Sequence, residues 1–337
     1  SSDVCSSDLL KLTKRSKNEI ARSQIDLAVV SVLLDAGAGS SWRYKDSQTG
    51  LNFSRSEGLA IASLRLFESG VLSQSGLDDP LRVDAASLQA LTPEILAMEF
   101  QVSQSNQLLG LEDRAKLLNR LGDTLLKQKH IFEAEGTFRP GNLFDYLTRS
   151  QVTGVLEARD ILIAVLQGMG EIWPDGSWID NVAIGDAGYH EVVKRSDITD
   201  GIVPFHKLSQ WMSYSLIEPL QEAGFKVNNL DALTGLAEYR NGGLFIDTKA
   251  ISLKDRTQLE VVHDPKSPLV VEWRALTVVL LDKLAEKIRR STNTDSGSMP
   301  LASILQGGTW SAGRRIAQQL RANGVPPLQL NSRGTIF

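Results

Sequence analysis

Apolar side chains recur along most of the chain at the three- and four-residue spacing that places them on one face of an α-helix. Residues 16–35 depart from this pattern, because their second half is apolar on every side, which is typical of a helix buried in a core. The one-sided pattern predicts further helices at residues 54–70, 93–100, 111–127, 142–148, 156–169, 205–217, 268–290 and 311–322. The chain is therefore expected to be mainly α.

Local signals indicate where some of these helices begin and end. Ser54 and Glu57 form the Ser-x-x-Glu pattern of a capping box at the start of a helix. Gly37 is expected to end the first helix as a glycine C-cap, and Pro219 is expected to kink or end the helix that contains it. Residues 244–253 read as extended and follow an Asn-Gly pair, which is a strong hairpin signal. We therefore expect one small β-hairpin at this place.

The 337 residues are long for one core and short for two typical domains. Residues 1–10 open with a Ser/Asp-rich stretch without any periodic pattern, and we interpret them as a non-native or disordered leader. Residues 11–337 contain no internal repeat and are predicted to form a single helical domain with room for two lobes.

Composition and charge exclude several classes of protein. Apolar residues make up 42% and charged residues 23%, as in ordinary globular proteins. No apolar run approaches the roughly 18 residues of a membrane helix, and no signal-peptide pattern is visible, which predicts a cytoplasmic protein without a membrane partner. Lys and Arg total 36 against 40 for Asp and Glu, a formal charge of −4 with no basic stripe, so no nucleic-acid partner is predicted.

The sequence contains no set of residues with the types and spacing of metal or cofactor ligands. Cys5 is the only cysteine, and the four histidines lack partners at ligand spacing, so we predict no metal and no cofactor. The remaining expectation is a partner that is a small molecule. Nothing in the pattern indicates the oligomeric state.

Polar side chains that interrupt the helical pattern are candidate site residues. Asp35 lies at the C-terminal end of the first helix, where the helix dipole disfavours an acid by a few tenths to about 1 kcal/mol; a site role and a solvent-facing helix end explain it equally well. Trp42, Tyr44 and Arg55 interleave aromatic and basic groups that can grip a base or a sugar. Glu57 is better explained as a cap.

The helix predicted at residues 205–217 has two polar–aromatic faces. His206 and Gln210 share one face, and Trp211 lies on the next. This arrangement favours the wall of a polar pocket slightly over a surface helix with a packed tryptophan.

The densest break in the pattern is at residues 233–247. If the chain is extended there, Glu238 and Arg240 project to the same face. An Asn-Gly turn does not call for a second glycine, so Gly243 indicates close approach by another backbone or a ligand. The alternative is an acid and a base flanking a turn in solvent. The candidates from this segment are Glu238, Tyr239, Arg240, Asn241 and Asp247.

Two further candidates lie on the helix predicted at residues 268–290. Arg274 lies on the apolar stripe of this helix and is therefore expected to be buried. A buried guanidinium needs an acidic partner or a bound anion. Glu272 is placed over apolar residues one turn later. A site role is favoured over a surface pair for both.

Residues 307–315 read as a glycine-rich loop that leads into a helix, and its free backbone N–H groups could cradle a phosphate. Ordinary capping by Thr309 or Ser311 explains the segment at least as well. The candidate phosphate ligands are Gly308, Thr309 and Arg314.

Several long motifs make the chain recognisable: Leu-Asp-Ala-Gly-Ala-Gly at 34–39, Arg-Ser-Glu-Gly-Leu-Ala at 55–60, Val-Pro-Phe-His-Lys-Leu-Ser-Gln-Trp at 203–211, Glu-Tyr-Arg-Asn-Gly-Gly-Leu at 238–244, Val-Glu-Trp-Arg-Ala-Leu-Thr at 271–277 and Gly-Gly-Thr-Trp-x-Ala-Gly-Arg at 307–314. From about residue 26 to 337 the chain resembles the family of the fourth protein of the URC uracil-catabolism pathway of fungi and bacteria. That family usually has an additional helical N-terminal stretch. We therefore expect this chain to be N-terminally truncated, with the native product continuing upstream.

The family is similar, more remotely, to the queuosine-salvage N-glycosylases, which implies a helical DNA-glycosylase-like architecture. In that comparison Tyr239-Arg240-Asn241 falls on a Phe-Arg-Asp motif, and Arg274 falls within a Lys-Arg-Ala-Gln motif. Because Asn241 stands where those proteins have the acid, Glu238 or Asp247 would have to supply the carboxylate.

The resemblance implies a reaction. The pathway opens the uracil ring while it is attached to ribose, and release of urea from ribosylurea, or from its 5-phosphate, is the step left for this family. The acids available are Glu238, Asp247 and Asp35, with Arg240, Arg274 and His206 as donors or anchors. A non-catalytic nucleotide-binding partner or regulator of the pathway is the alternative. A phosphoribosyl transferase is disfavoured, because no acidic pair followed by a phosphate loop is present.

Overall fold

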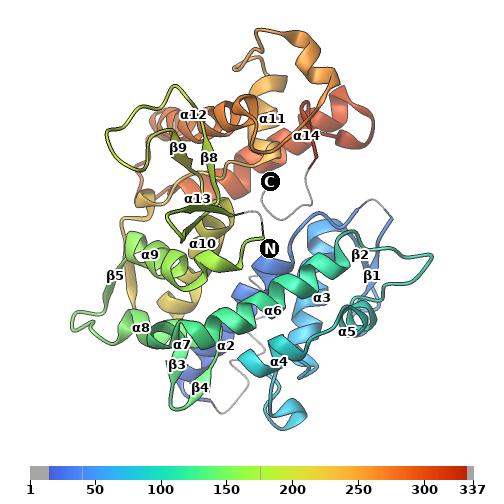
Figure 1. Cartoon of the computed structure of the whole chain (residues 1–337), viewed down its shortest axis with the longest axis vertical. Helices are drawn as coiled ribbons and strands as arrows, with labels where there is room; N and C mark the ends of the chain where they lie inside the picture. The colour runs from blue at the N-terminus through green and yellow to red at the C-terminus, as the bar shows by residue number, and fades with distance from the viewer. Residues whose placement is uncertain (1–14, 40, 175, 332–337) are drawn as a thin grey trace. The chain divides into compact units, whose positions relative to one another are not determined.

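The computed structural model describes residues 15–39, 41–174 and 176–331 (Figure 1). These residues form two compact units. The first unit contains the described residues up to Pro174 together with Ser215–Asn228, and the second contains those between Pro174 and Ser215 and those after Asn228. The predicted leader at residues 1–10 lies outside the described ranges.

The first unit is mainly helical. Its helices are α2 (Lys17–Leu34), α3 (Arg55–Glu68), α4 (Ala85–Ala90), α5 (Pro93–Glu99), α6 (Leu111–Lys127), α7 (Lys129–Phe132), α8 (Leu143–Thr148) and α9 (Ala158–Met169). Short strands form the antiparallel pairs β1 (Tyr44–Lys45) with β2 (Asn52–Phe53) and β3 (Glu133–Ala134) with β4 (Thr137–Phe138), and the parallel pair β5 (Val155–Glu157) with β10 (Lys226–Asn228).

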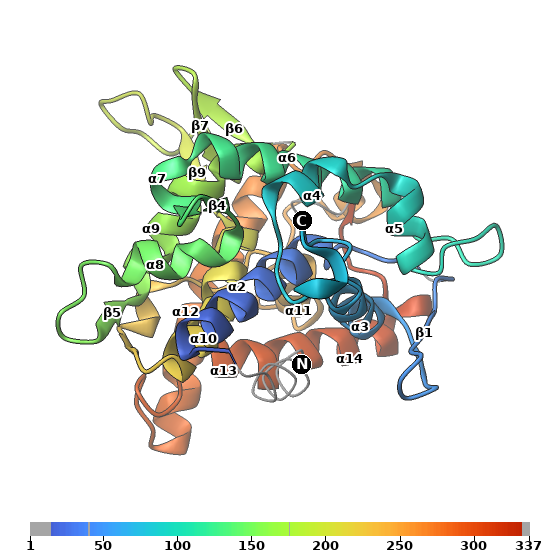
Figure 2. The same ribbon diagram turned by 90° about the horizontal axis from the view of Figure 1, so that it is seen from below.

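Helix α2 is the centre of the first unit, where it contacts α3, α6 and α8 (Figure 2). Its all-round apolar sequence is buried, as the pattern predicts. A carboxylate is buried with it: Asp26 is 0% exposed and accepts hydrogen bonds from the backbone N–H groups of Val83 (3.0 Å) and Gly141 (2.6 Å) and from Nε of Arg139 (2.8 Å). This acid–arginine pair ties α2 to segments far away in the sequence.

Two predicted helix ends are wrong in detail. Gly37 is not a left-handed C-cap; α2 ends earlier, at Asp35, and the buried guanidinium of Arg114 donates to the carbonyls of Leu34 (3.2 Å) and Ala36 (3.0 Å). A side chain from α6 therefore satisfies carbonyls that the helix leaves unpaired. At the start of α3, Ser54 makes no side-chain capping bond, so the predicted capping box does not form there.

The second unit holds the remaining elements. Its helices are α10 (Lys207–Glu222, shared with the first unit), α11 (Tyr239–Asp247), α12 (Pro268–Thr292), α13 (Leu301–Ile304) and α14 (Trp310–Leu320). Its strand pairs are β6 (Ser177–Ile179) with β7 (Val182–Gly185), β8 (Ala187–Tyr189) with β9 (Ile202–Pro204), and β11 (Val262–His263) with β12 (Gln329–Leu330). Pro219 does not end α10, which continues to Glu222.

The extended segment predicted at residues 244–253 is wrong, because α11 occupies residues 244–247 and the rest of the segment contains no strand. A Cβ on Gly242 would lie 2.7 Å from the Trp273 ring and 2.8 Å from the Thr277 hydroxyl, so this glycine lets α11 pack closely on α12. A Cβ on Gly243 would lie 3.0 Å from Pro327. Gly242 therefore serves helix packing and Gly243 allows the close approach of Pro327, and the small hairpins of this unit lie at β6–β7 and β8–β9 instead.

The predicted glycine-rich loop at residues 307–315 is helical as well. A π-helical turn, Leu305–Thr309, joins α13 to α14 without a break. Backbone N–H groups within a continuous helix are not the free donors of a helix start, so the phosphate cradle predicted from Gly308, Thr309 and Arg314 does not form.

The fold is mainly α with small strand pairs, as predicted. Leu281 and Ala285 of α12 lie in the core of the second unit with Phe245 of α11. Within the ranges that the structure describes, no helix combines the length and the hydropathy that membrane crossing requires.

Candidate functional site

A buried ion pair organises one face of α12. Arg274 is 3% exposed and donates to both carboxylate oxygens of Asp186 at 2.8 and 2.7 Å, while its guanidinium lies 4.0 Å from the ring centre of Phe205. Burial acts to raise the pKa of Asp186, but the Arg274 guanidinium outweighs burial and holds that pKa below its usual value. Of the two partners expected for Arg274, an acid or an anion, the structure shows the acid.

Asp186 also positions the start of α10. Its side chain accepts the backbone N–H of Lys207 (3.0 Å), and its carbonyl accepts those of Phe205 (3.0 Å) and His206 (2.9 Å). His206 has a positive φ of 49°, and its Nδ1 is buried without a hydrogen-bond partner among the residues that the structure describes. Burial lowers the pKa of His206, with Arg274 acting in the same direction and Asp186 against it. The imidazole is therefore a neutral group beside the ion pair.

Glu238 begins α11 as its N-cap residue. One carboxylate oxygen accepts the backbone N–H of Arg240 (2.9 Å), and the other accepts that of Asn241 (2.6 Å). The side chain is buried, and burial raises the pKa of Glu238 despite these two bonds and the positive charges of Arg240 and Lys207. The backbone that leads into Glu238 lies beside the ion pair, because the carbonyl of the preceding Ala237 accepts from Arg274 Nε (3.4 Å).

This geometry corrects the prediction that Glu238 and Arg240 share one face of an extended chain. They are the cap and the second residue of a helix. The Arg240 guanidinium lies 4.9 Å from the ring centre of Trp310 and 5.4 Å from that of Tyr239. Trp310 also contacts Trp211 of α10, with 5.6 Å between ring centres. The predicted Trp211, Tyr239 and Arg240 are therefore brought together.

Three predicted residues have structural hydrogen bonds. Asn241 is 1% exposed, donates to the carbonyl of Leu236 (3.2 Å) and accepts from the Thr309 hydroxyl (2.9 Å), which links α11 to the π-helical turn. Gln210 is buried and accepts the backbone N–H of Thr234 (3.1 Å). These contacts stabilise the walls of the site.

Asp247 lies at the other end of α11 from Glu238. Both of its oxygens accept from the Arg321 guanidinium, at 2.7 and 2.6 Å. An acid held in this way has little capacity left to act on a substrate.

Four predicted residues belong to the first unit, whereas this cluster belongs to the second. Asp35 ends α2, and Arg55 is exposed at the start of α3 with a φ of 55°. Tyr44 is buried, and Trp42 is 0% exposed, with its indole N–H donating to the carbonyl of Phe100 (3.0 Å). Trp42 and Tyr44 are core side chains rather than an exposed aromatic grip. Ligand binding by any of the predicted residues stays a prediction.

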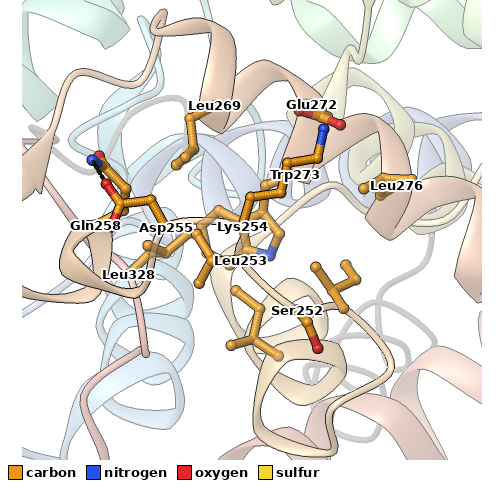
Figure 3. Close-up of a pocket in the computed structure, with 12 residues that line it drawn as sticks. Ser252, Leu253, Lys254, Asp255, Gln258, Leu269, Glu272, Trp273, Leu276 and Leu328 are labelled. Atoms are coloured by element: carbon orange, nitrogen blue, oxygen red, sulfur yellow. Dashed lines mark hydrogen bonds between the residues drawn. The ribbon is translucent and has the colours of Figure 1, made fainter.

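A pocket of about 330 Å³ lies on the other side of α12 (Figure 3). At about 100° per residue, Leu269, Glu272, Trp273 and Leu276 share a helix face that points away from Arg274. The predicted Glu272 is exposed at its rim, where Figure 3 shows the end of the Lys254 side chain pointing toward it. The other lining residues are Ile246, Ile251, Ser252, Leu253, Asp255, Gln258 and Leu328.

The sequence did not identify three residues of this cluster as site candidates, namely Asp186, Phe205 and Trp310. The demand of Arg274 for an acid was the one signal that could have led to Asp186. Among the residues that the structure describes, no group of three or more His, Cys, Asp or Glu side chains could hold a metal ion.

The fold and this cluster define a mainly α protein whose candidate site combines the buried Asp186, Glu238 and Arg274 with the half-buried Arg240 and with His206. The chain belongs to the family described as protein of unknown function (DUF1688), which it matches over residues 6–337. It is 40% identical over 347 aligned residues to uracil catabolism protein 4 of Lachancea kluyveri, covering 95% of this chain and 78% of that protein. It is 41% identical over 326 aligned residues to protein urg3 of Schizosaccharomyces pombe, covering 95% and 76%.

These matches confirm the resemblance to the uracil-catabolism protein 4 family. The remoter similarity to queuosine-salvage N-glycosylases stays a prediction.

Proposed function

We propose that this protein takes part in uracil catabolism as an N-glycosidase, which hydrolyses ribosylurea or its 5-phosphate to urea and the sugar. The name of the relative from Lachancea kluyveri supports the pathway. The observation that carries the reaction is Glu238, a buried carboxyl group with a raised pKa near Arg240, on a segment whose backbone contacts Arg274 of the Asp186–Arg274 pair. Perturbed acids of this kind concentrate at catalytic sites.

Hydrolysis of this C–N bond requires few protein groups. The bond between the anomeric carbon and the urea nitrogen breaks, its electron pair leaves with the nitrogen, which takes up a proton, and water adds to the carbon. The transition state resembles an oxocarbenium ion, which a nearby carboxylate stabilises. Glu238 stabilises or attacks the anomeric centre, and Arg240 orients the acid or the sugar. Asp247 is the weaker candidate, because Arg321 holds both of its oxygens.

Urea release from synthetic ribosylurea and ribosylurea 5-phosphate tests the proposal. The purified protein is expected to release urea in equal amounts with the sugar product, and in water enriched in oxygen-18 the label should appear in the sugar. Heat-denatured protein is the control. Tight binding of either substrate without urea would contradict the proposal.

The reaction should also depend on pH through Glu238. Because burial raises the pKa of this carboxyl, a catalytic carboxylate predicts that kcat/KM rises with pH through a value above the usual glutamate pKa of about 4.3. Stability should change in the opposite direction, since a group with a raised pKa in the folded state contributes stability at low pH that is lost as pH rises through that pKa. If kcat/KM instead falls as pH rises through the pKa of Glu238, Glu238 would be the proton donor.

A non-catalytic ligand-binding regulator is the second candidate. The pocket beside Glu272 favours it, since its volume of about 330 Å³ is at the small end of ligand sites and most of its lining is apolar. The regulator predicts binding of a pathway nucleoside or nucleotide without turnover, and Leu276→Trp, at the pocket wall, should block that binding.

A further inference from the structure

Arg240 differs from Arg274, Arg289 and Arg321, three buried or half-buried arginines of the second unit that hold an acid, because no carboxylate among the described residues bonds its guanidinium. It is half-buried, and over the described ranges its guanidinium contacts rings but forms no hydrogen bond or ion pair. The nearby Glu238 uses both oxygens on backbone N–H groups. The acids are Asp186 for Arg274 (2.7 Å), Asp231 for Arg289 (3.0 Å) and Asp247 for Arg321 (2.6 Å), and the exposed Arg290 pairs with Glu286 (3.4 Å).

The aromatic contacts of Arg240 position the guanidinium. The guanidinium lies over the rings of Trp310 and Tyr239, and because neither contact is a hydrogen bond, the N–H donors stay available to a ligand. The backbone is held too, because a Cβ on Gly313 would lie 2.4 Å from the Arg240 carbonyl oxygen, which shows how closely α14 packs on α11. A planar fork of donors held in this way matches a phosphate group in a bidentate manner.

We infer that Arg240 binds the phosphate monoester of the substrate, so that the sugar acted on is a ribose 5-phosphate derivative. The inference rests on the proposed function and names its substrate class. The two alternative anchors are disfavoured: Asp186 neutralises Arg274, and Gly308 and Thr309 lie inside a continuous helix. The positive charge of Arg240 acts on the Glu238 carboxyl against the effect of burial on its pKa, so the two groups are near enough for one pentose 5-phosphate to reach both.

Calorimetry with ribose 5-phosphate and ribose tests the inference without relying on turnover. In Arg240→Met the thioether side chain keeps the packing against both rings and removes the charge. Affinity for ribose 5-phosphate is expected to fall roughly 10- to 100-fold, as for the loss of hydrogen bonds to a charged group. Affinity for ribose should stay the same. Arg290→Met is the matched control, because Arg290 is 81% exposed on α12 and should change neither affinity.

Equal losses for both ligands in Arg240→Met would overturn the inference, as would equal affinity of the wild type for both ligands or no measurable binding of ribose 5-phosphate. If the methionine variant fails to fold, Arg240→Lys replaces it in the test. Because lysine keeps the positive charge, this variant should retain part of the preference for ribose 5-phosphate over ribose. The two proposals fail separately: urea released only from unphosphorylated ribosylurea would reject the phosphate subsite and leave the glycosidase standing, whereas binding of ribose 5-phosphate that depends on Arg240 without any urea release would reject the glycosidase alone.

Discussion

Replacing Glu238 by glutamine is expected to remove most urea release while the protein stays folded and still binds its sugar product. A positioned acid or base contributes roughly 100- to 10,000-fold to rate, and a loss of this size in kcat is expected if the carboxylate acts at the anomeric centre. Glutamine has nearly the same shape but cannot carry the negative charge. The measurement is single-turnover release of urea by the wild type and the variant.

The structure also predicts a side effect of this substitution. Both oxygens of Glu238 accept backbone N–H groups at the start of α11. A glutamine amide has only one acceptor oxygen, so its NH₂ group would face the second N–H, which would lose its acceptor. Stability should therefore fall by about 1–3 kcal/mol, which thermal denaturation will show. Asp231→Asn is a matched control, since Asp231 pairs with Arg289 away from the cluster. Full activity in the Glu238 variant would transfer the role to Asp247 or Asp35.

Periodic helices were predictable from the sequence because their signals are local. The apolar spacing at residues 111–127 gives the bounds of α6 as the structure has them. The same reasoning failed at Asn241-Gly242, where a turn signal competes with tertiary packing. A helix forms there because Glu238 caps it and because Gly242 allows close contact with Trp273. A short stretch of sequence reveals neither of these interactions.

Half of the central ion pair was predictable. Arg274 stands on an apolar stripe of its helix, so burial and the need for a partner followed from spacing alone. Asp186 is 88 positions away along the chain, and nothing local marks it as that partner. The Asp26–Arg139 pair, 113 positions apart, shows the same limit in the first unit. Pairings of this kind depend on the tertiary fold, which a single sequence does not reveal.

Replacing Arg274 by alanine is expected to lower the free energy of unfolding by about 3–5 kcal/mol, because it leaves the Asp186 carboxylate buried without its counter-charge. The same carboxylate positions the first residue of α10, so the damage should reach the site. Guanidinium chloride denaturation followed by tryptophan fluorescence measures the loss. Exposed Arg290→Ala should stay within about 0.5 kcal/mol of the wild type.

A double variant separates loss of the pair from loss of packing. Asp186→Leu combined with Arg274→Met replaces both charges by apolar side chains, and such replacements of a buried pair are often neutral or stabilising. We expect the double variant to recover much of the stability lost in Arg274→Ala, though not all, because the backbone N–H of Lys207 loses its acceptor. If Arg274→Ala costs less than about 1 kcal/mol, the pair contributes little to the fold. Its burial would then point to a role in the reaction, so the urea-release assay should be repeated on that stable variant.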